Sequence, residues 1–249
     1  MVTSVATNPE ASHPQVPIAC PERNGVRLEC LLVESGNQEP VMLDVAEQPV
    51  LHLASQSARR RELLSRHGIA HRAAHPGIDD GLLTSGDVPA SQWVASLAYL
   101  KAVAGLESSP ELPVLGADTV CVKDGAIIGQ PIDADDARRI LLLLQNGSHE
   151  VVTGVAVVWP GRGRREIFVD RAQVHVGEIG TGPIETYIAS GEWRGKAGAY
   201  NLAERVDAGW PIRCDGDPST VMGLPMTALL ARLQRWGAKV SGGGAGSAS

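Results

Sequence analysis

Short apolar runs alternate with amphipathic segments from residue 50 to residue 237, and this alternation constrains the fold more than any other feature. Buried strands are typically encoded by runs such as VLHLAS, PVLGADTVCV, HEVVTGVAVVWP and REIFVDRAQVHV. Apolar residues at helical spacing occur between these runs, in VPASQWVASLAYLKAVAGL and DADDARRILLLLQNG. Interleaved strands and helices predict an α/β fold.

Two of the connections are too short to contain a helix. Asp124-Gly125 leads from the second strand into AIIGQP, and PGRGR joins HEVVTGVAVVWP to REIFVDRAQVHV. Hairpins make antiparallel neighbours, so we predict a mixed sheet flanked by helices rather than an all-parallel doubly wound sheet. Two more helices are expected at GPIETYIASG and GLPMTALLARLQRWG.

The two ends of the chain lack this alternation. Residues 1–49 hold no periodic pattern, and Met42 is an alternative start because the recognisable pattern begins just after it. The tail SGGGAGSAS has no side chains to bury, which predicts disorder. We therefore expect an N-terminal extension of unknown role (1–49), one domain (50–237) and a disordered tail (238–249).

Composition excludes several classes of function. The formal net charge of -6 argues against a general affinity for nucleic acid, and 4% aromatic residues leave little for a base-stacking platform. We see no apolar run of membrane-span length, and the N-terminus lacks the basic start and apolar core of a secretory signal. No CxxC pair occurs among the four cysteines, which favours free thiols in a reducing cytoplasm.

The stretch LASQSARRRELLSRHG places three arginines at an unfavourable position. Ser57 is a suitable N-cap and Gly68 ends the predicted helix, so Arg59–Arg61 fall in its first turn. Exposed cations cost ~0.3–1 kcal/mol each at this end of a helix, where the backbone N–H groups already carry positive partial charge. A phosphate chain, bound also by the Ser55 hydroxyl, would compensate. A solvated basic patch, or pairing with Glu62 or a distant carboxylate, is the alternative.

A carboxylate interrupts one of the buried strands. Asp118, in GADTV, must be paired, bound to a metal or placed at the mouth of a cleft, unless it caps a turn. Gly116 leaves space for a close neighbour. Lys196, in GKAGAY, lies among small residues that allow a phosphate to approach, although a plain loop is the alternative. Asp79 and Asp80 on their own are typical of solvated turns.

Together these features predict a small basic crevice that faces one or two carboxylates. Such a crevice suits a polyphosphate with a divalent metal that bridges carboxylate and phosphate oxygens. The sequence contains no Walker loop, no HExxH and no GxSxG, so serine-nucleophile hydrolysis is unsupported.

Four blocks, LASQSARRRELL, LGADTVCV, GKAGAY and VMGLPM, resemble the Maf family of septum-formation-inhibitor-like proteins in order and spacing, over about Val50–Gly237. The resemblance implies an elongated α/β fold with a mixed sheet and a central cleft, similar to inosine triphosphate pyrophosphatases. It also implies hydrolysis of a nucleoside triphosphate between the α and β phosphates, to a monophosphate and pyrophosphate, with Mg²⁺ or Mn²⁺. Related proteins are often dimers, so a homodimer is expected.

The resemblance assigns roles to the positions that match the family's motifs. Asp118 matches the general base, which orients or activates water, and the metal contact. Substrate-binding roles fall on Ser55, Arg59, Arg60, Asp80, Lys101, Gln130 and Lys196.

This chain departs from the family's pattern at three places in or near these motifs. Ala58 replaces the usual proline, and Gln130 stands where many members have lysine, which removes one positive charge. Ala203 stands where pyrimidine-specific members have glutamine, and Glu204 is the nearest polar residue. GKAGAY resembles the dTTP/UTP branch, whereas CDGDPSTVMGLP resembles the branch that prefers 7-methyl-GTP.

A pyrimidine or modified nucleotide is the expected substrate. Two other interpretations of the function remain. A nucleotide-binding regulator of cell division without significant catalysis is the alternative from another class, and a broader phosphohydrolase is the alternative enzyme.

Overall fold

A computed structural model of the chain describes residues 50–78, 83–161 and 163–236. The expectations for residues 1–49, for the tail 238–249, and for Asp79 and Asp80 concern positions outside the described residues.

The described residues form a seven-stranded mixed sheet in the order β2-β1-β3-β5-β6-β7, with β4 paired to β3. β1 runs parallel to β2 and β3, and the remaining pairs are antiparallel. The predicted mixed sheet and both predicted hairpins are thus confirmed. The strands are β1 Leu51–Ala54, β2 His71–Ala74, β3 Val114–Lys123, β4 Ala126–Ile128, β5 Gly147–Val158, β6 Arg165–Val176 and β7 Ile212–Asp215.

The helices include all five that the sequence predicts. Ser57 caps α1, whose Arg60 backbone N–H donates to the Ser57 hydroxyl, and Gly191 ends α4 in the left-handed conformation. Several short elements were not predicted: β2, α5, α6 and β7. The α-helices are α1 Ala58–Arg66, α2 Ala90–Ala104, α3 Ala134–Leu144, α4 Thr181–Ser190, α5 Leu202–Asp207, α6 Pro218–Val221 and α7 Met226–Arg235, and the 3₁₀ turns are η2 Gly105–Ser108 and η3 Ala197–Ala199.

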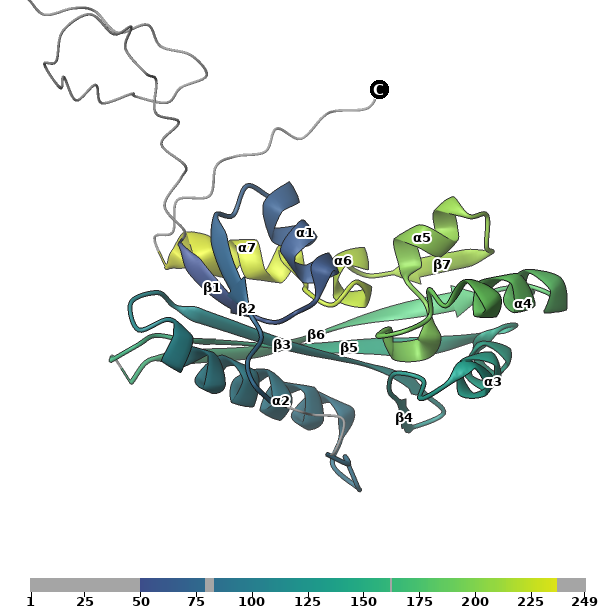
Figure 1. Cartoon of the computed structure of the whole chain (residues 1–249), viewed down its shortest axis with the longest axis horizontal. Helices are drawn as coiled ribbons and strands as arrows, with labels where there is room; N and C mark the ends of the chain where they lie inside the picture. Colours follow the sequence, from purple (N-terminus) through teal and green to yellow (C-terminus); the bar gives the residue numbers. More distant parts are fainter. Residues whose placement is uncertain (1–49, 79–82, 162, 237–249) are drawn as a thin grey trace, which may run out of the picture. The chain divides into compact units, whose positions relative to one another are not determined.

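One face of the sheet is covered by α2, which packs against β3 and β5 (Figure 1). Glycines on the strands make the close approach possible. A Cβ atom at Gly116 would lie 2.2 Å from the carbonyl oxygen of Ala98, and one at Gly154 would lie 2.5 Å from that of Val94. This confirms the expectation that Gly116 leaves space for a neighbour.

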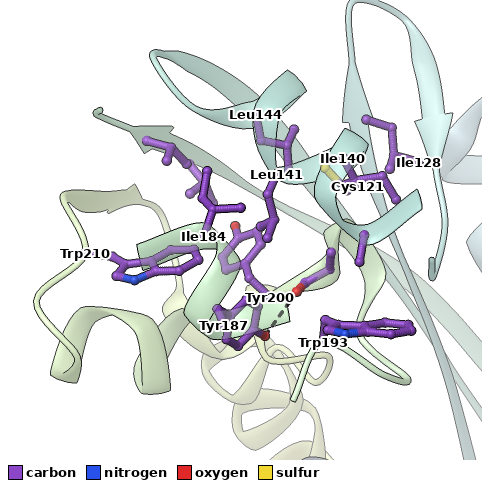
Figure 2. Close-up of a cluster of buried hydrophobic side chains, with 14 of the residues drawn as sticks. Cys121, Ile128, Ile140, Leu141, Leu144, Ile184, Tyr187, Trp193, Tyr200 and Trp210 are labelled. Atoms are coloured by element: carbon purple, nitrogen blue, oxygen red, sulfur yellow. Dashed lines mark hydrogen bonds between the residues drawn. The ribbon is translucent and has the colours of Figure 1, made fainter. Parts of the chain in front are cut away.

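The opposite face of β1, β3, β5 and β6 is covered by α1 and α7, whose Leu64 and Leu229 are fully buried (Figure 1). Another cluster of buried hydrophobic residues surrounds the aromatic side chains of the C-terminal half (Figure 2). There the Tyr187 hydroxyl donates to the Ala199 carbonyl at 3.0 Å. This cluster therefore anchors the segment that contains GKAGAY.

Candidate active site

A cleft lies where β3 has a strand partner on one side only. β1 pairs with β3 as far as Leu115, and β4 pairs with it from Cys121 onward. Between these pairings, within the part of the chain that the structure describes, residues 116–120 pair with β5 alone. Successive strand side chains point to opposite faces, so Asp118 faces α2 and Thr119 faces α1. Both faces of the sheet thus contribute groups to one gap.

Asp118 is held by an ion pair on the α2 side. The Lys101 Nζ atom donates to Asp118 Oδ1 at 2.7 Å, and the two side chains are only 12% and 11% exposed. The position in the middle of β3 excludes the interpretation of Asp118 as a turn cap. A buried carboxylate needs a partner, and Lys101 provides it beside the cleft.

Arg60 is fixed on the α1 side by groups from three separate segments. Its Nε donates to the Gly223 carbonyl at 2.8 Å, its Nη1 to the Ser55 hydroxyl at 3.3 Å and its Nη2 to the Thr119 hydroxyl at 3.2 Å. Gly223 has a φ of +99°, and a Cβ there would lie 3.3 Å from Arg60 Nε. A glycine at this position is therefore what lets the guanidinium lie against the backbone.

Arg59 lies at the other side of the same helix turn. Its Nη2 donates to the Gly195 carbonyl at 3.3 Å. Burial lowers the pKa of Arg59, and the nearby Glu204 carboxylate opposes this shift, so the guanidinium remains a cation. Glu62 pairs instead with Arg66, at 2.5 Å. The alternative in which Glu62 pairs with the first-turn arginines is therefore not found.

Lys196 is buried and forms an ion pair with Glu204 of α5. The other Glu204 oxygen accepts a hydrogen bond from Asn201 Nδ2 at 2.9 Å. The backbone N–H of Glu204 in turn donates to Asn201 Oδ1, which caps α5. The lysine therefore belongs to an anchored network at the cleft rather than to a plain loop.

Two adjoining hollows make up the cleft, and their walls share Ser57, Arg59, Arg60, Lys101, Gln130 and Gly195. The first hollow also contains Asp118, Thr119, Tyr200, Asn201 and Gly223, and the second contains Ser55, Lys196 and Glu204. Every described residue that the sequence predicts for the site thus lines the cleft, and Asp80 lies outside the described residues. Thr119 and Gly223 were missed, although both lie within the quoted motifs.

The donor atoms of the cleft suit a hard cation. Among the described residues no group of three or more His, Cys, Asp and Glu side chains gathers to hold a metal by itself. Mg²⁺ is commonly bound by one or two carboxylates together with substrate phosphates, and Asp118 offers such a carboxylate. Burial raises the pKa of the Cys121 thiol to about 12, which argues against a thiolate ligand or nucleophile on β3.

The fold and the cleft define an α/β protein with a cationic, carboxylate-containing site open at the sheet. The sequence model of the Maf family, described as Maf-like protein, matches residues 50–236, and the chain belongs to this family. The dTTP/UTP pyrophosphatase of Acholeplasma laidlawii is 38% identical over 194 residues, which cover 74% of this chain and 95% of that protein. The dTTP/UTP pyrophosphatase of an Anaeromyxobacter species is 41% identical over 191 residues, which cover 75% and 89%.

A solved structure of a HAM1 protein from Coxiella burnetii gives a TM-score of 0.41 at 13% identity, covering 76% of this chain and all of that one. This similarity is weak, and the fold assignment rests on the sheet described above. In the described ranges, none of the helices has the length and apolar character needed to span a membrane.

Proposed function

We propose that this chain hydrolyses a nucleoside triphosphate between the α and β phosphates, releasing a monophosphate and pyrophosphate. The observation that carries the proposal is the buried Lys101–Asp118 pair, which faces Arg59 and Arg60 across one cleft. Relatives named dTTP/UTP pyrophosphatases, 38–41% identical to this chain, support a pyrimidine nucleotide as the substrate.

The triphosphate chain binds at the first turn of α1. Arg59 and Arg60 provide forked donors, and the backbone N–H groups at the start of the helix point the same way. Lys101, Lys196 and the Ser55 hydroxyl add donors along the two hollows. The bound phosphates then compensate the cations that crowd this helix end, and the same groups stabilise charge as pyrophosphate leaves.

Asp118 orients a water molecule and accepts its proton during in-line attack at the α phosphorus. Lys101 holds the carboxylate in place through its hydrogen bond to Oδ1. Mg²⁺ or Mn²⁺, held by Asp118 and phosphate oxygens, would neutralise phosphate charge there. Asp80, from the family resemblance, is proposed as a further substrate contact.

Other parts of the proposal rest on the family resemblance. We place the pyrophosphatase domain at residues 50–237, after an extension of residues 1–49, and expect a cytoplasmic homodimer. Gln130, exposed at the junction of the hollows, contributes an amide in place of the family's lysine charge. Because the motifs of two branches are mixed, dTTP, UTP and 7-methyl-GTP are all candidate substrates. The assay below distinguishes them.

The test is incubation of the purified protein with magnesium and dTTP, UTP, CTP, ATP, GTP or 7-methyl-GTP, followed by chromatography of the products. Monophosphate plus pyrophosphate from one or two nucleotides is the expected result. Free phosphate alone would favour a broader phosphohydrolase. Binding without any product would favour the regulator of cell division.

A further inference from the structure

We propose that Thr153 is a positioning residue for Arg60. It acts through a hydrogen-bond relay that runs across the neighbouring strands β3 and β5 beneath the cleft. Thr153 lies on β5, is fully buried and is absent from the walls of both hollows. The inference deepens the proposed function, on which it rests, because Arg60 matters here as a phosphate-binding group.

The relay consists of two threonines on neighbouring strands and one backbone carbonyl. Thr119 and Thr153 are register partners on β3 and β5, and their hydroxyl oxygens are 2.9 Å apart. The Thr153 hydroxyl also lies 2.8 Å from the carbonyl oxygen of Thr220, on α6. The Thr119 hydroxyl lies 3.2 Å from Arg60 Nη2.

The direction of each hydrogen bond in the relay follows from the chemistry of its ends. A carbonyl oxygen can only accept, so Thr153 donates its single hydroxyl proton to Thr220. Thr153 must then accept from Thr119, which uses the single proton of Thr119. The Thr119 oxygen is left to present a lone pair to Arg60, which has only donors.

A second arm connects the same carbonyl to the same arginine. The Gly223 backbone N–H donates to the Thr220 carbonyl at 3.1 Å, and the Gly223 carbonyl accepts from Arg60 Nε at 2.8 Å. The two arms form a closed ring from Arg60 through Thr119, Thr153, Thr220 and Gly223. Two nitrogens of the guanidinium, Nε and Nη2, are therefore connected to the same backbone carbonyl.

The carbonyl itself is held in place by α6. The Thr220 hydroxyl donates to Asp170 of β6, and Asp217 caps α6 through the Ser219 N–H at 2.8 Å. Asp170 is in turn the register partner of Thr153. The ring thus ties the α1 arginine to β3 and β5, Asp170 links it to β6, and Thr153 is a fully buried member of it.

Thr153→Val keeps the shape and branching of the side chain and removes only the hydroxyl. The proton of Thr119 then loses its acceptor and can turn toward the guanidinium, which removes the hydrogen bond that orients Arg60 Nη2. We expect the KM for dTTP to rise about tenfold, the equivalent of a lost hydrogen bond, while kcat changes much less. Thr153→Ser keeps the hydroxyl and should retain the KM of the wild type.

The matched control is Thr186→Val on α4. Thr186 also donates from a threonine hydroxyl to a backbone carbonyl, that of Gly182 at 3.0 Å, but lies outside the walls of both hollows. Its KM should not change. Equal effects of the two valine variants on KM would overturn the relay, because they would reflect a general loss of hydroxyl groups.

A double-mutant cycle with Arg60→Gln separates positioning from general weakening of the fold. Thr153→Val should raise KM in the wild-type background and add nothing once Arg60 is gone. An equal rise in both backgrounds would refute the inference. If Thr153→Val does not fold, Thr119→Val breaks the same arm beside the arginine and takes its place in the cycle.

Calorimetric titration with inorganic pyrophosphate gives a readout that does not need turnover. Weaker pyrophosphate binding by Thr153→Val than by Thr153→Ser supports the relay even if the wild type releases no pyrophosphate from any nucleotide, which would defeat the proposed function alone. Equal binding by the two variants overturns the relay and leaves the proposed function standing.

Discussion

At the residue scale, Asp118 combines burial with a lysine partner, and this makes it the most sensitive position in the cleft. Asp118→Asn keeps the shape but removes the base, so we expect the rate of pyrophosphate release to fall by roughly a thousandfold. The amide oxygen can still accept from Lys101, and we therefore expect a cooperative fold, with a free energy of unfolding lowered by about 1–3 kcal/mol. Initial rates and urea unfolding measure the two effects.

The matched control for this variant is Asp124→Asn. Asp124 lies in the exposed β3–β4 turn with a φ of 50°, a conformation that asparagine also adopts readily. Both rate and stability should stay at their wild-type values. An Asp118→Asn rate within a few-fold of wild type would remove Asp118 from the catalytic role.

Some of the residues that the sequence predicts for the cleft stand out because their chemistry conflicts with their local context. Arg59 and Arg60 are cations at a helix N-terminus, and Asp118 is a carboxylate inside an apolar run, so each requires a partner from elsewhere. Thr153 presents no such conflict, because threonine is common in strands. Its role depends on a carbonyl 67 positions away in the chain, and no local pattern encodes that contact.

At the scale of elements, the position of Lys101 depends on how closely α2 approaches the sheet. Gly116→Ala places a Cβ 2.2 Å from the Ala98 carbonyl oxygen, and α2 must move away. We expect a loss of about 1–3 kcal/mol in the free energy of unfolding and a lower kcat/KM, because Lys101 and Asp118 separate. Gly182→Ala is the control, since its Cβ meets nothing within 4 Å. Unchanged kcat/KM in Gly116→Ala would disconnect helix approach from catalysis.

The long strand β5 contains a buried histidine that couples stability to pH. His149 Nε2 lies 2.9 Å from the Tyr200 hydroxyl, and burial, with smaller contributions from Lys123 and His175, lowers the pKa of His149 to about 4. Since this pKa lies below the ordinary 6.5, the unfolded chain binds more protons between these values. The contribution of neutral His149 to the free energy of unfolding is complete above pH 6.5 and is lost as the pH falls toward 4.

Urea unfolding at pH 7 and pH 5 tests this coupling in the wild type and in His149→Gln. Between these two pH values the wild type should lose about 2 kcal/mol more than the variant, because glutamine does not titrate. The same pH dependence in both proteins would show that other groups govern acid destabilisation.

Element prediction succeeds where a segment displays a period, forms an apolar run as β1 does, or follows a clear turn as β4 does. The helices α1, α2, α3, α4 and α7 and the long strands were predicted. The missed elements β2, β7, α5 and α6 contain only four to six residues each. β2, with the sequence HRAA, has no buried side chain, so its structure comes from pairing with β1 rather than from apolar alternation.

At the scale of the described fold, the cleft is a product of strand order. Hairpins near Asp124 and PGRGR predict antiparallel neighbours, and the mixed character of the sheet follows from the sequence. The order β2-β1-β3-β5 and the unpaired stretch between β1 and β4 depend on contacts between distant segments, which local patterns do not encode. The motifs therefore predict which residues belong to the site. The stretch of β3 between its pairings with β1 and β4 explains how Asp118 and Thr119 reach the site from opposite faces.

In the proposed reaction, water activated at Asp118 attacks the α phosphorus. The most direct measurement is hydrolysis of dTTP in ¹⁸O-enriched water, with mass spectrometry of both products. We expect the heavy oxygen in the monophosphate and unlabelled pyrophosphate, because the new bond forms at the α phosphorus. Label in the pyrophosphate and none in the monophosphate would place the attack at the β phosphorus and refute the proposed mechanism.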